Sequence, residues 1–434
     1  MNLQGLCVRY SENQKRDTRD IEKSDMNTLK RDIILLFTTR IIRLFAYGFI
    51  SVVLALYLAE IGFSEYAIGL LLSLTLAGDV LVSLWITTVA DRIGRRKMLI
   101  AGSLLMLLAG IAFIFTNNPI LLTLAAIVGI ISPSGNEIGP FLSIEQAALS
   151  QLIPNEKRTA IFGWYNLVGS FATAAGALGS GWLAEILQQF EFTALNSYRI
   201  ILLGYSAAGI VLMIFFIRLS PDIETVSIPD SKYRLGLHRS RNVVIRLSSL
   251  FALDAFAGGF ILQSMMAYWF HIRFGADTGM LGSIFFGANI LAGISALLAA
   301  RIAKHIGLIN TMVFTHIPSN ILLCMVPLMP DLEWAIAVLL LRFSISQMDV
   351  PTRQSYTMAV VAPDERTAAS GITGVARSVG ASISPVLTGF FLAHPSLISM
   401  PFFLAGGLKI IYDLSLYSMF QKVKPPEENQ SRER

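Results

Sequence analysis

Residues 90 to 97 read Ala90-Asp91-Arg92-Ile93-Gly94-Arg95-Arg96-Lys97 and separate two long apolar runs, at about 66–88 and 98–116. This stretch is too polar for lipid, whereas each flanking run has about the 20 apolar residues that a helix needs to cross a bilayer. The whole chain of 434 residues is 54% hydrophobic and only 15% charged. A soluble protein of this length could not bury so much apolar surface in its cores. The sequence therefore predicts an all-α membrane protein.

The apolar runs predict twelve spans joined by mostly short loops. Their approximate ranges are 33–59, 66–88, 98–116, 119–150, 160–188, 199–218, 245–271, 278–302, 308–328, 332–360, 367–393 and 397–420. A longer polar loop divides them six and six. We therefore expect a cytoplasmic tail at 1–32, a six-helix bundle at 33–218, a central loop at 219–244, a second six-helix bundle at 245–420 and a tail at 421–434.

Basic residues gather in alternate loops and are nearly missing from the loops between them. The basic loops carry Arg92, Arg95, Arg96, Lys97, Lys157, Arg158, Lys232, Arg234, Arg239, Arg241, Arg301, Lys304 and Arg366. Because Lys and Arg concentrate on the inner side of membrane proteins, we expect these loops and both termini in the cytoplasm. The net charge of +5 is then an anchoring charge and not a nucleic-acid footprint. The expected location is the plasma membrane, which is the inner membrane in a bacterium.

The two predicted halves resemble each other. The stretch IPNEKRTAIFGWYNLVGSFATAAGALGSGWL, from Ile153, follows the fourth span, and APDERTAASGITGVARSVGASISPVLTGFFL, from Ala362, follows the tenth. With one residue skipped, the aligned pairs include Pro154 with Pro363, Glu156 with Glu365, Arg158 with Arg366, Gly163 with Gly371, and Gly181 with Gly389. Ile93-Gly94 is echoed by Ile306-Gly307. Carriers are often built from such repeats, with the solute site between them near the bilayer midplane, so we expect pseudo-symmetric bundles.

The loop at 90–97 also resembles the signature loop of the major facilitator superfamily, an acid followed by Arg-x-Gly-Arg-Arg. The likeness covers essentially the whole chain after the tail, because the loop, the twelve spans and the two halves all agree. It implies a carrier that works by alternating access between two six-helix bundles. The family pattern begins with Gly four positions before the acid, where this chain has Thr87.

The resemblance implies a cytoplasmic gate in this loop. Gly94 permits a tight turn with positive φ, and Asp91 is expected against the positive end of a helix from the other half. We expect Arg92 and Arg95 to pair with Glu145 at the inner end of the fourth span. The aligned residues Arg158 and Arg366 are expected on the same side. The alternative is that the basic residues of the loop only anchor it.

Ionisable residues inside spans are costly in lipid and are usually functional. Arg40 and Arg43 lie three apart on one face of the first span; alternatively, they extend to the headgroups. Asp254 in the seventh span and Arg342 and Asp349 in the tenth are comparable candidates.

The fourth span contains Ser132-Pro133-Ser134-Gly135-Asn136-Glu137-Ile138-Gly139-Pro140. Two prolines and two glycines in so short a stretch weaken a helix, and freed backbone groups at that depth are tolerated only inside protein or beside a wet cavity. We therefore place Asn136 and Glu137 on the transport path; the alternative for Glu137 is a structural ion pair.

Taken together, the residues and the resemblance predict a secondary active transporter of a small polar or charged organic solute, coupled to protons through Glu137 or Asp254 and acting as a monomer. A glycine-rich stretch at 176–181 resembles the pattern of the family's proton antiporters without its proline and gives a weak preference for export. The alternatives are a proton-driven multidrug exporter and a transporter-like receptor or assembly partner that carries nothing. We expect no enzyme activity, cofactor, metal site or nucleic-acid partner.

Overall fold

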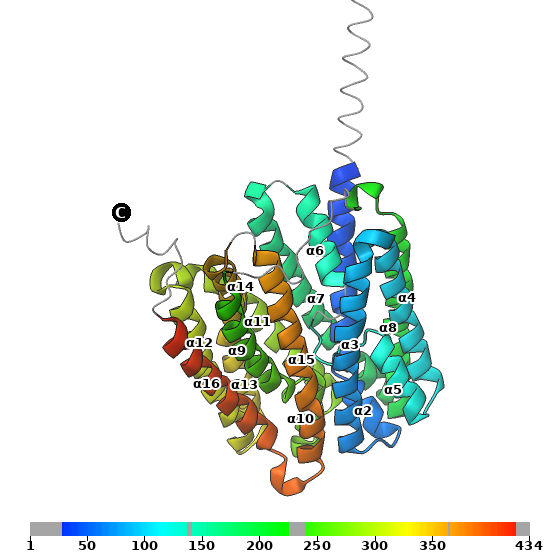
Figure 1. Ribbon diagram of the computed structural model, residues 1–434. Coiled ribbons are helices and arrows are strands. Elements are labelled where there is room, and N and C mark those ends of the chain that lie inside the picture. The colour runs from blue at the N-terminus through cyan, green and yellow to red at the C-terminus, as the bar shows by residue number, and fades with distance from the viewer. Residues whose placement is uncertain (1–27, 137–140, 154, 225–238, 363–364, 422–434) are drawn as a thin grey trace, which may run out of the picture.

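The computed structural model describes residues 28–136, 141–153, 155–224, 239–362 and 365–421, with side chains except at 87–92, 155–160 and 367. Within these ranges the regular structure is helical and contains no β-strand. Most helices run roughly along one direction, so that their ends gather at two opposite faces of a bundle (Figure 1).

The N-terminal half begins with a helix that starts ahead of the predicted first span. Its helices are Thr28–Ser51, α2 (Leu54–Glu60), α3 (Glu65–Ile93), α4 (Arg95–Phe115), α5 (Pro119–Val128), α6 (Phe141–Leu152), α7 (Asn155–Gln189) and α8 (Ala194–Ile217). A short 3-10 turn, η1 (Pro221–Ile223), follows α8.

The C-terminal half repeats this order. Its helices are α9 (Arg241–Gly259), α10 (Gln263–Phe274), α11 (Thr278–Ile306), α12 (Leu308–Met325), η2 (Val326–Leu328), α13 (Leu332–Ser346), α14 (Asp349–Val360), α15 (Arg366–Leu392), η4 (Pro395–Leu397) and α16 (Met400–Phe420).

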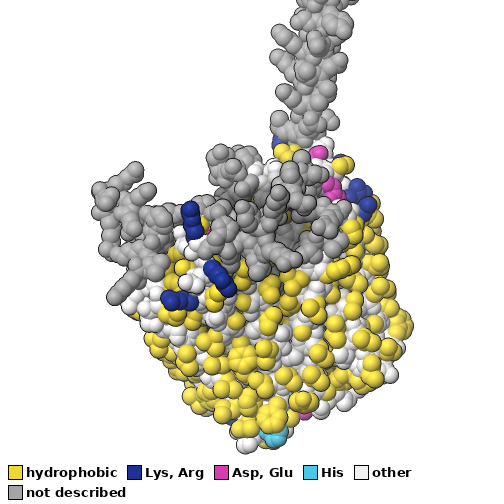
Figure 2. Space-filling view, viewed as in Figure 1, with side chains coloured by type: hydrophobic (Ala, Val, Ile, Leu, Met, Phe, Trp, Pro, Cys, Tyr) yellow, Lys and Arg dark blue, Asp and Glu magenta, His cyan; other side chains and the backbone are white. Residues whose placement is uncertain are grey.

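The predicted fold class is confirmed. Within the described residues, eleven helical segments are long and apolar enough to cross a membrane. The remaining span is divided between α5, which is apolar but short, and α6. Hydrophobic side chains cover most of the visible surface, and the visible Lys and Arg lie toward its upper end (Figure 2). Such an apolar surface suits lipid and not water.

Matching glycine turns define one face of the bundle. Gly94 joins α3 to α4 with φ +116°, and Gly307 joins α11 to α12 with φ +87°. A side chain would strain this backbone, so the predicted tight turn at Gly94 and its echo at Gly307 are confirmed. We call the end with these turns and Ser220 the basic face, and the end where the chain turns at Gly62 and Gly275 the opposite face.

Two glycine pairs bring the halves into close contact near the opposite face. A Cβ atom on Gly181 of α7 would lie 2.7 Å from the Cα of Gly282 in α11. One on Gly389 of α15 would lie 3.0 Å from the Cα of Gly69 in α3. Only glycine permits such an approach. Because Gly181 and Gly389 are aligned in the sequence repeat, the two contacts follow the pseudo-symmetry of the halves.

Within the described residues four spans are interrupted, and they hold corresponding places in the two halves. The helix breaks lie at residues 52–53, 129–136, 260–262 and 347–348, in the first, fourth, seventh and tenth spans. Discontinuous helices at matching positions of two repeats are the usual framework of a carrier's binding site. We therefore look for the binding site among the residues around these breaks.

Candidate functional site

The breaks of the two halves meet and satisfy each other's polar groups. Gln263 Nε2 donates to Ser51 Oγ at 2.8 Å, and the backbone N–H of Ser264 donates to the carbonyl of Pro133 at 3.0 Å. Gly135 lies beside them with φ +69°, and a Cβ atom there would lie 3.0 Å from Ser51 Oγ. These contacts hold the halves together and would have to part if the halves separated here.

The fourth span is also strained. Ile130 has φ +54°, a conformation that β-branched residues rarely adopt. The hydroxyl of Tyr205 donates to the Ile130 carbonyl at 2.7 Å and holds it in place. Backbone strain of this kind clusters at functional sites. The predicted weakening of the helix by prolines and glycines is confirmed over residues 129–136.

A buried ion pair occupies the N-terminal half between the first helix, α6 and α7. Arg43 donates two hydrogen bonds to Glu145, at 2.7 and 2.6 Å, and both side chains are fully buried. Thr39 donates to the same carboxylate at 3.0 Å, and the hydroxyl of Tyr165 donates to its other oxygen. Arg40 lies over the Tyr165 ring, with its guanidinium carbon 4.2 Å from the centroid. The carboxylate on α6 is thus enclosed by donors from two other elements, the first helix and α7.

A larger charged cluster occupies the C-terminal half around Asp254 of α9. Its Oδ1 accepts from Lys409 Nζ of α16 at 2.5 Å. Its Oδ2 accepts from Arg353 of α14 at 2.9 Å and from Arg377 of α15 at 3.2 Å. Arg353 also binds Asp349 at 2.9 Å. One acid therefore ties three other helices to α9.

The two clusters occupy related positions with reversed charge. In the N-terminal half the base Arg43 stands on the first helix and the acid on α6, whereas in the C-terminal half Asp254 stands on α9 and the base on α14. The repeat aligns Arg377 with Gly169. A Cβ atom on Gly169 would lie 2.8 Å from Arg40 Nε, so glycine there makes room for that arginine.

The structure brings several predicted site residues together and corrects one predicted pairing. Arg43 lies against Glu145, and Asp254 and Asp349 share Arg353. The expected pairing of Arg95 with Glu145 is wrong, because Glu145 is bound to Arg43. Arg95 Nη1 instead donates to Gln151 at 3.0 Å and to the Ile223 carbonyl at 3.1 Å, which ties the start of α4 to the segment after α8.

The remaining predicted site residues are scattered. Arg342 is buried over the Phe343 ring, with its guanidinium carbon 4.9 Å from the centroid. Asn136 is exposed, and Arg366 is exposed at the first turn of α15. Glu137 and the side chains of Asp91, Arg92 and Arg158 lie outside the described residues, so their expected roles stay predictions.

Sequence reasoning missed several charged residues of the site. They are Arg353, Arg377, Lys409 and Asp413. The signal was available, because all four are ionisable residues within apolar spans. Tyr165 gave no such signal, since a tyrosine within a span is ordinary.

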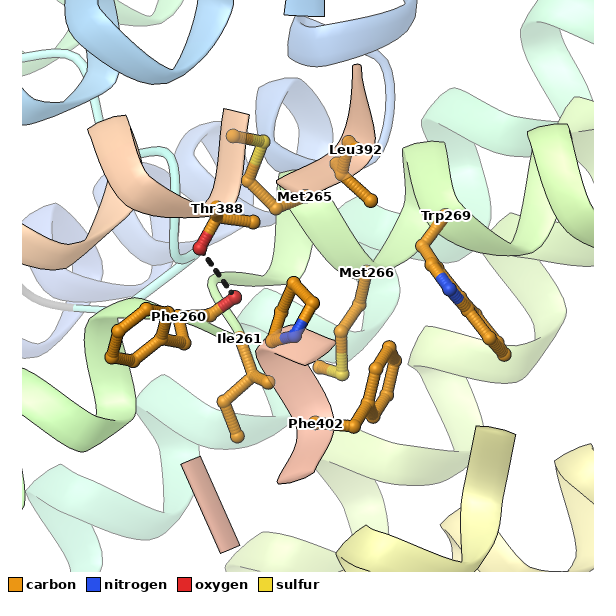
Figure 3. A pocket seen from close by; sticks show the side chains of 9 residues that line it. Phe260, Ile261, Met265, Met266, Trp269, Thr388, Leu392 and Phe402 are labelled. Atoms are coloured by element: carbon orange, nitrogen blue, oxygen red, sulfur yellow. Dashed lines mark hydrogen bonds between the residues drawn. The ribbon is translucent and has the colours of Figure 1, made fainter. Parts of the chain in front are cut away.

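The cavities do not by themselves locate the solute. A space of about 10 Å³ beside the seventh-span break is lined by Phe260, Ile261, Met265, Met266, Trp269, Thr388, Leu392, Pro401 and Phe402 (Figure 3). It is too small for an organic solute. A mostly apolar hollow of about 520 Å³ lies between α9 and α15, beside Phe256 and Ile383. Among the described residues, no three His, Cys, Asp or Glu side chains are placed to hold a metal ion.

Comparisons with known proteins agree with this arrangement. The family model described as Major Facilitator Superfamily matches residues 36–385. An uncharacterized membrane protein of Saccharomyces cerevisiae, YJR124C, is 31% identical over 422 residues, which cover 90% of this chain and 94% of that protein. A mutant of the nucleoside transporter NupG has a TM-score of 0.72 at 14% identity, covering 89% of this chain and 99% of that one. The D-xylose-proton symporter has a TM-score of 0.69 at 14% identity, covering 91% and 98%.

The family match spans most of the chain, and the fold is shared with solved transporters. The chain therefore belongs to the Major Facilitator Superfamily and is an integral membrane transporter, not an enzyme.

Proposed function

We propose that this protein is a proton-coupled secondary carrier of a small organic anion. The observation that carries the proposal is a surplus of positive charge inside the C-terminal half. Glu365 lies before α15 at the basic face, where its carboxylate accepts from the backbone N–H groups of Arg239 and Ser240. Within the spans, four bases stand against three acids: Arg342, Arg353, Arg377 and Lys409 against Asp254, Asp349 and Asp413. Uncompensated charge in a span is costly, and a bound anion would balance it.

Arg377 is the residue best suited to receive the anion. Arg353 is buried and held by two carboxylates, whereas Arg377 makes one ion pair, at 3.2 Å, and its side chain is 35% exposed. A guanidinium also matches a carboxylate in a planar, two-bond arrangement. Arg377 could therefore bind a solute carboxylate while Asp254 keeps its other two partners.

The direction and energy of transport are also proposals. The buried acids of α9, α14 and α16 supply groups for proton coupling, and the fold is shared with a D-xylose-proton symporter. The export preference rests on the glycines at 176–181, yet packing against Gly282 accounts for Gly181. Export therefore stays a prediction.

The orientation of the protein in the membrane follows from the rule that Lys and Arg concentrate on the cytoplasmic side. We propose that the basic face is cytoplasmic, because Arg95 and Arg96 begin α4 there. Cysteine at Arg96 should then be protected from an impermeant maleimide in whole cells, while cysteine at Asn117 should react.

Uptake into proteoliposomes tests the proposed solute class. Labelled organic acids, nucleosides and sugars are compared with and without a pH gradient, and the acids should be taken up preferentially and faster with the gradient. Arg377→Gln should slow uptake about 10- to 100-fold, because a charge-assisted hydrogen bond is worth roughly 1.5–3 kcal/mol. Arg301→Gln, at an exposed position of α11, is the matched control and should leave uptake unchanged.

Three results would contradict the proposal. Uptake of neutral solutes with no effect of Arg377→Gln would exclude an anion carrier. Uptake of large apolar cations would instead favour the multidrug exporter, for which the apolar hollow between α9 and α15 is the one supporting feature. Failure of every solute class would favour the transporter-like receptor.

A further inference from the structure

A second charged group lies between α12 and α16, away from the helix breaks. His316 Nδ1 is 2.8 Å from Asp413 Oδ1, and Asn320 Nδ2 donates to Asp413 Oδ2 at 3.0 Å. The exposed fraction of the His316 side chain is 5% and that of Asp413 is zero. Both oxygens of a fully buried carboxylate are therefore engaged, one of them by a ring that can gain or lose a proton near neutral pH.

This group is connected to the Asp254 cluster through α16. Lys409 and Asp413 are four residues apart, so they lie one turn apart on the same face of the helix. Lys409 Nζ contacts Asp254 at 2.5 Å, while Asp413 contacts His316. The ammonium group thus binds Asp254 directly and is also attracted by the Asp413 carboxylate one turn along the same helix.

The surrounding helices supply the other titratable and charged groups. They are Asp254 on α9, Arg342 on α13, Asp349, Arg353 and Tyr356 on α14, Arg377 on α15, and Lys409 and Tyr412 on α16. The interior of α11, from 278 to 300, carries no ionisable residue. Asp413 is therefore the acid nearest to His316, and Lys409 is the cation nearest to Asp413 along α16.

The N-terminal half shows that packing does not require these charges. There α4 and α8 hold the places of α12 and α16, and a Cβ atom on Gly209 of α8 would lie 3.0 Å from the Ser103 carbonyl of α4. Residues 98–115 and 200–217 contain no His, Asp, Glu, Lys or Arg. Buried ion pairs are weak contributors to stability, so the presence of one between α12 and α16, and of none between residues 98–115 and 200–217, indicates a function.

We propose that His316 and Asp413 form the proton-binding site of this carrier, and that Lys409 transmits its charge state to Asp254. The inference deepens the proposed function, since it assigns the coupling proton to a site, but proton binding can be measured without any solute.

The exchange involves one proton and one moving side chain. Neutral His316 keeps its Nδ1–H, which donates a hydrogen bond to Asp413, and it accepts the incoming proton at Nε2. The resulting imidazolium neutralises Asp413, so Lys409 stays on Asp254. When the proton leaves, Asp413 again carries an uncompensated charge and attracts Lys409. Asp254 then holds Arg377 more firmly, and the anion loses its partner. Proton and anion consequently favour each other's binding.

Nuclear magnetic resonance of the full chain, labelled with ¹³C-histidine in nanodiscs, tests the site directly. One of the histidine signals that titrate over roughly pH 5 to 8, the range in which an imidazole changes charge, should vanish in His316→Gln. Asp413→Asn should move its midpoint about 1 to 3 pH units lower, because a carboxylate favours the charged ring. Lys409→Met should move it roughly 1 unit higher, because a repelling cation is removed.

His305, exposed at the end of α11, is the internal control, and its midpoint should not move in either variant. A His316 signal that does not titrate in the unmodified protein overturns the proposal, as does a midpoint that ignores both substitutions. A titrating His316 in a protein whose solute uptake ignores the pH gradient would leave the proton site standing and reject the coupled carrier.

Discussion

Arg43 and Glu145 are fully buried and joined by two short hydrogen bonds. Removing one member of such a pair leaves the other charge without its partner in the protein interior. We expect Arg43→Met to lower the free energy of unfolding by about 3–5 kcal/mol, the usual cost of an uncompensated buried charge. Arg43→Met combined with Glu145→Met should recover most of that loss, because apolar pairs of similar volume are tolerated there.

Unfolding in detergent measures both variants, with Arg31→Met as the exposed control. Transport should be absent from the single and the double variant if the pair serves the carrier and not only the fold. Losses that simply add in the double variant would show that the two side chains are not energetically coupled.

The same residues show how much of the site can be predicted from the sequence at the level of single residues. Arg43 and Glu145 could each be selected as charges near a membrane, but their partnership could not, because 102 positions separate them and only the packing of the first helix against α6 brings them together. Lys409 and Asp413 needed no structure to be noticed as intramembrane charges. What they contact depends on α9 and α12, which the sequence does not place.

At the scale of whole helices, the break in the fourth span lies beside a hydrogen bond that joins the two halves. Gly135 is at φ +69°, next to the cross-half hydrogen bond between Ser51 and Gln263. Alanine there should cost about 1–2 kcal/mol of backbone energy, because left-handed geometry strains a Cβ atom, and it would also crowd Ser51. We expect Gly135→Ala to slow transport several-fold at equal protein abundance.

Gly163→Ala is the matched control. Gly163 lies within α7, and a Cβ atom there would meet nothing within 4 Å. Because alanine favours helix over glycine, this variant should be as stable as the parent and fully active. Equal transport by the two variants would contradict the importance of the break.

Elements were predicted more completely than their interruptions. All twelve spans follow from apolar length, and the fourth-span break follows from its prolines and glycines. The seventh-span break, at 260–262, contains Phe260, Ile261 and Leu262, which read as continuous apolar helix. It forms where backbone groups find partners in the other half, as Ser264 does with Pro133. Such tertiary compensation leaves no local pattern.

For the molecule as a whole, alternating access would require that contacts between the two halves break and form again. Hydrogen bonds join them from Tyr268 to Glu65 at 3.1 Å, from Trp182 to Ser283 at 3.1 Å, and from Gln263 to Ser51 at 2.8 Å. The first two lie near the opposite face, where the glycine pairs also meet. A carrier that opens toward this face must break these contacts in each cycle.

A reversible cross-link between Ser51 and Gln263 tests this requirement. In a chain whose native cysteines are replaced, Cys7→Ser and Cys324→Ser, the pair Ser51→Cys and Gln263→Cys should be joined by a short bis-methanethiosulfonate cross-linker, because the native side chains meet at 2.8 Å and the shorter cysteines leave a gap for it. Cross-linking should stop net uptake in proteoliposomes, and reduction should restore it. Each single-cysteine chain controls for the substitutions and should be insensitive to the cross-linker. Full uptake by the cross-linked protein would mean that the halves do not part at this level, and the helix breaks would then have to serve transport without opening toward the opposite face.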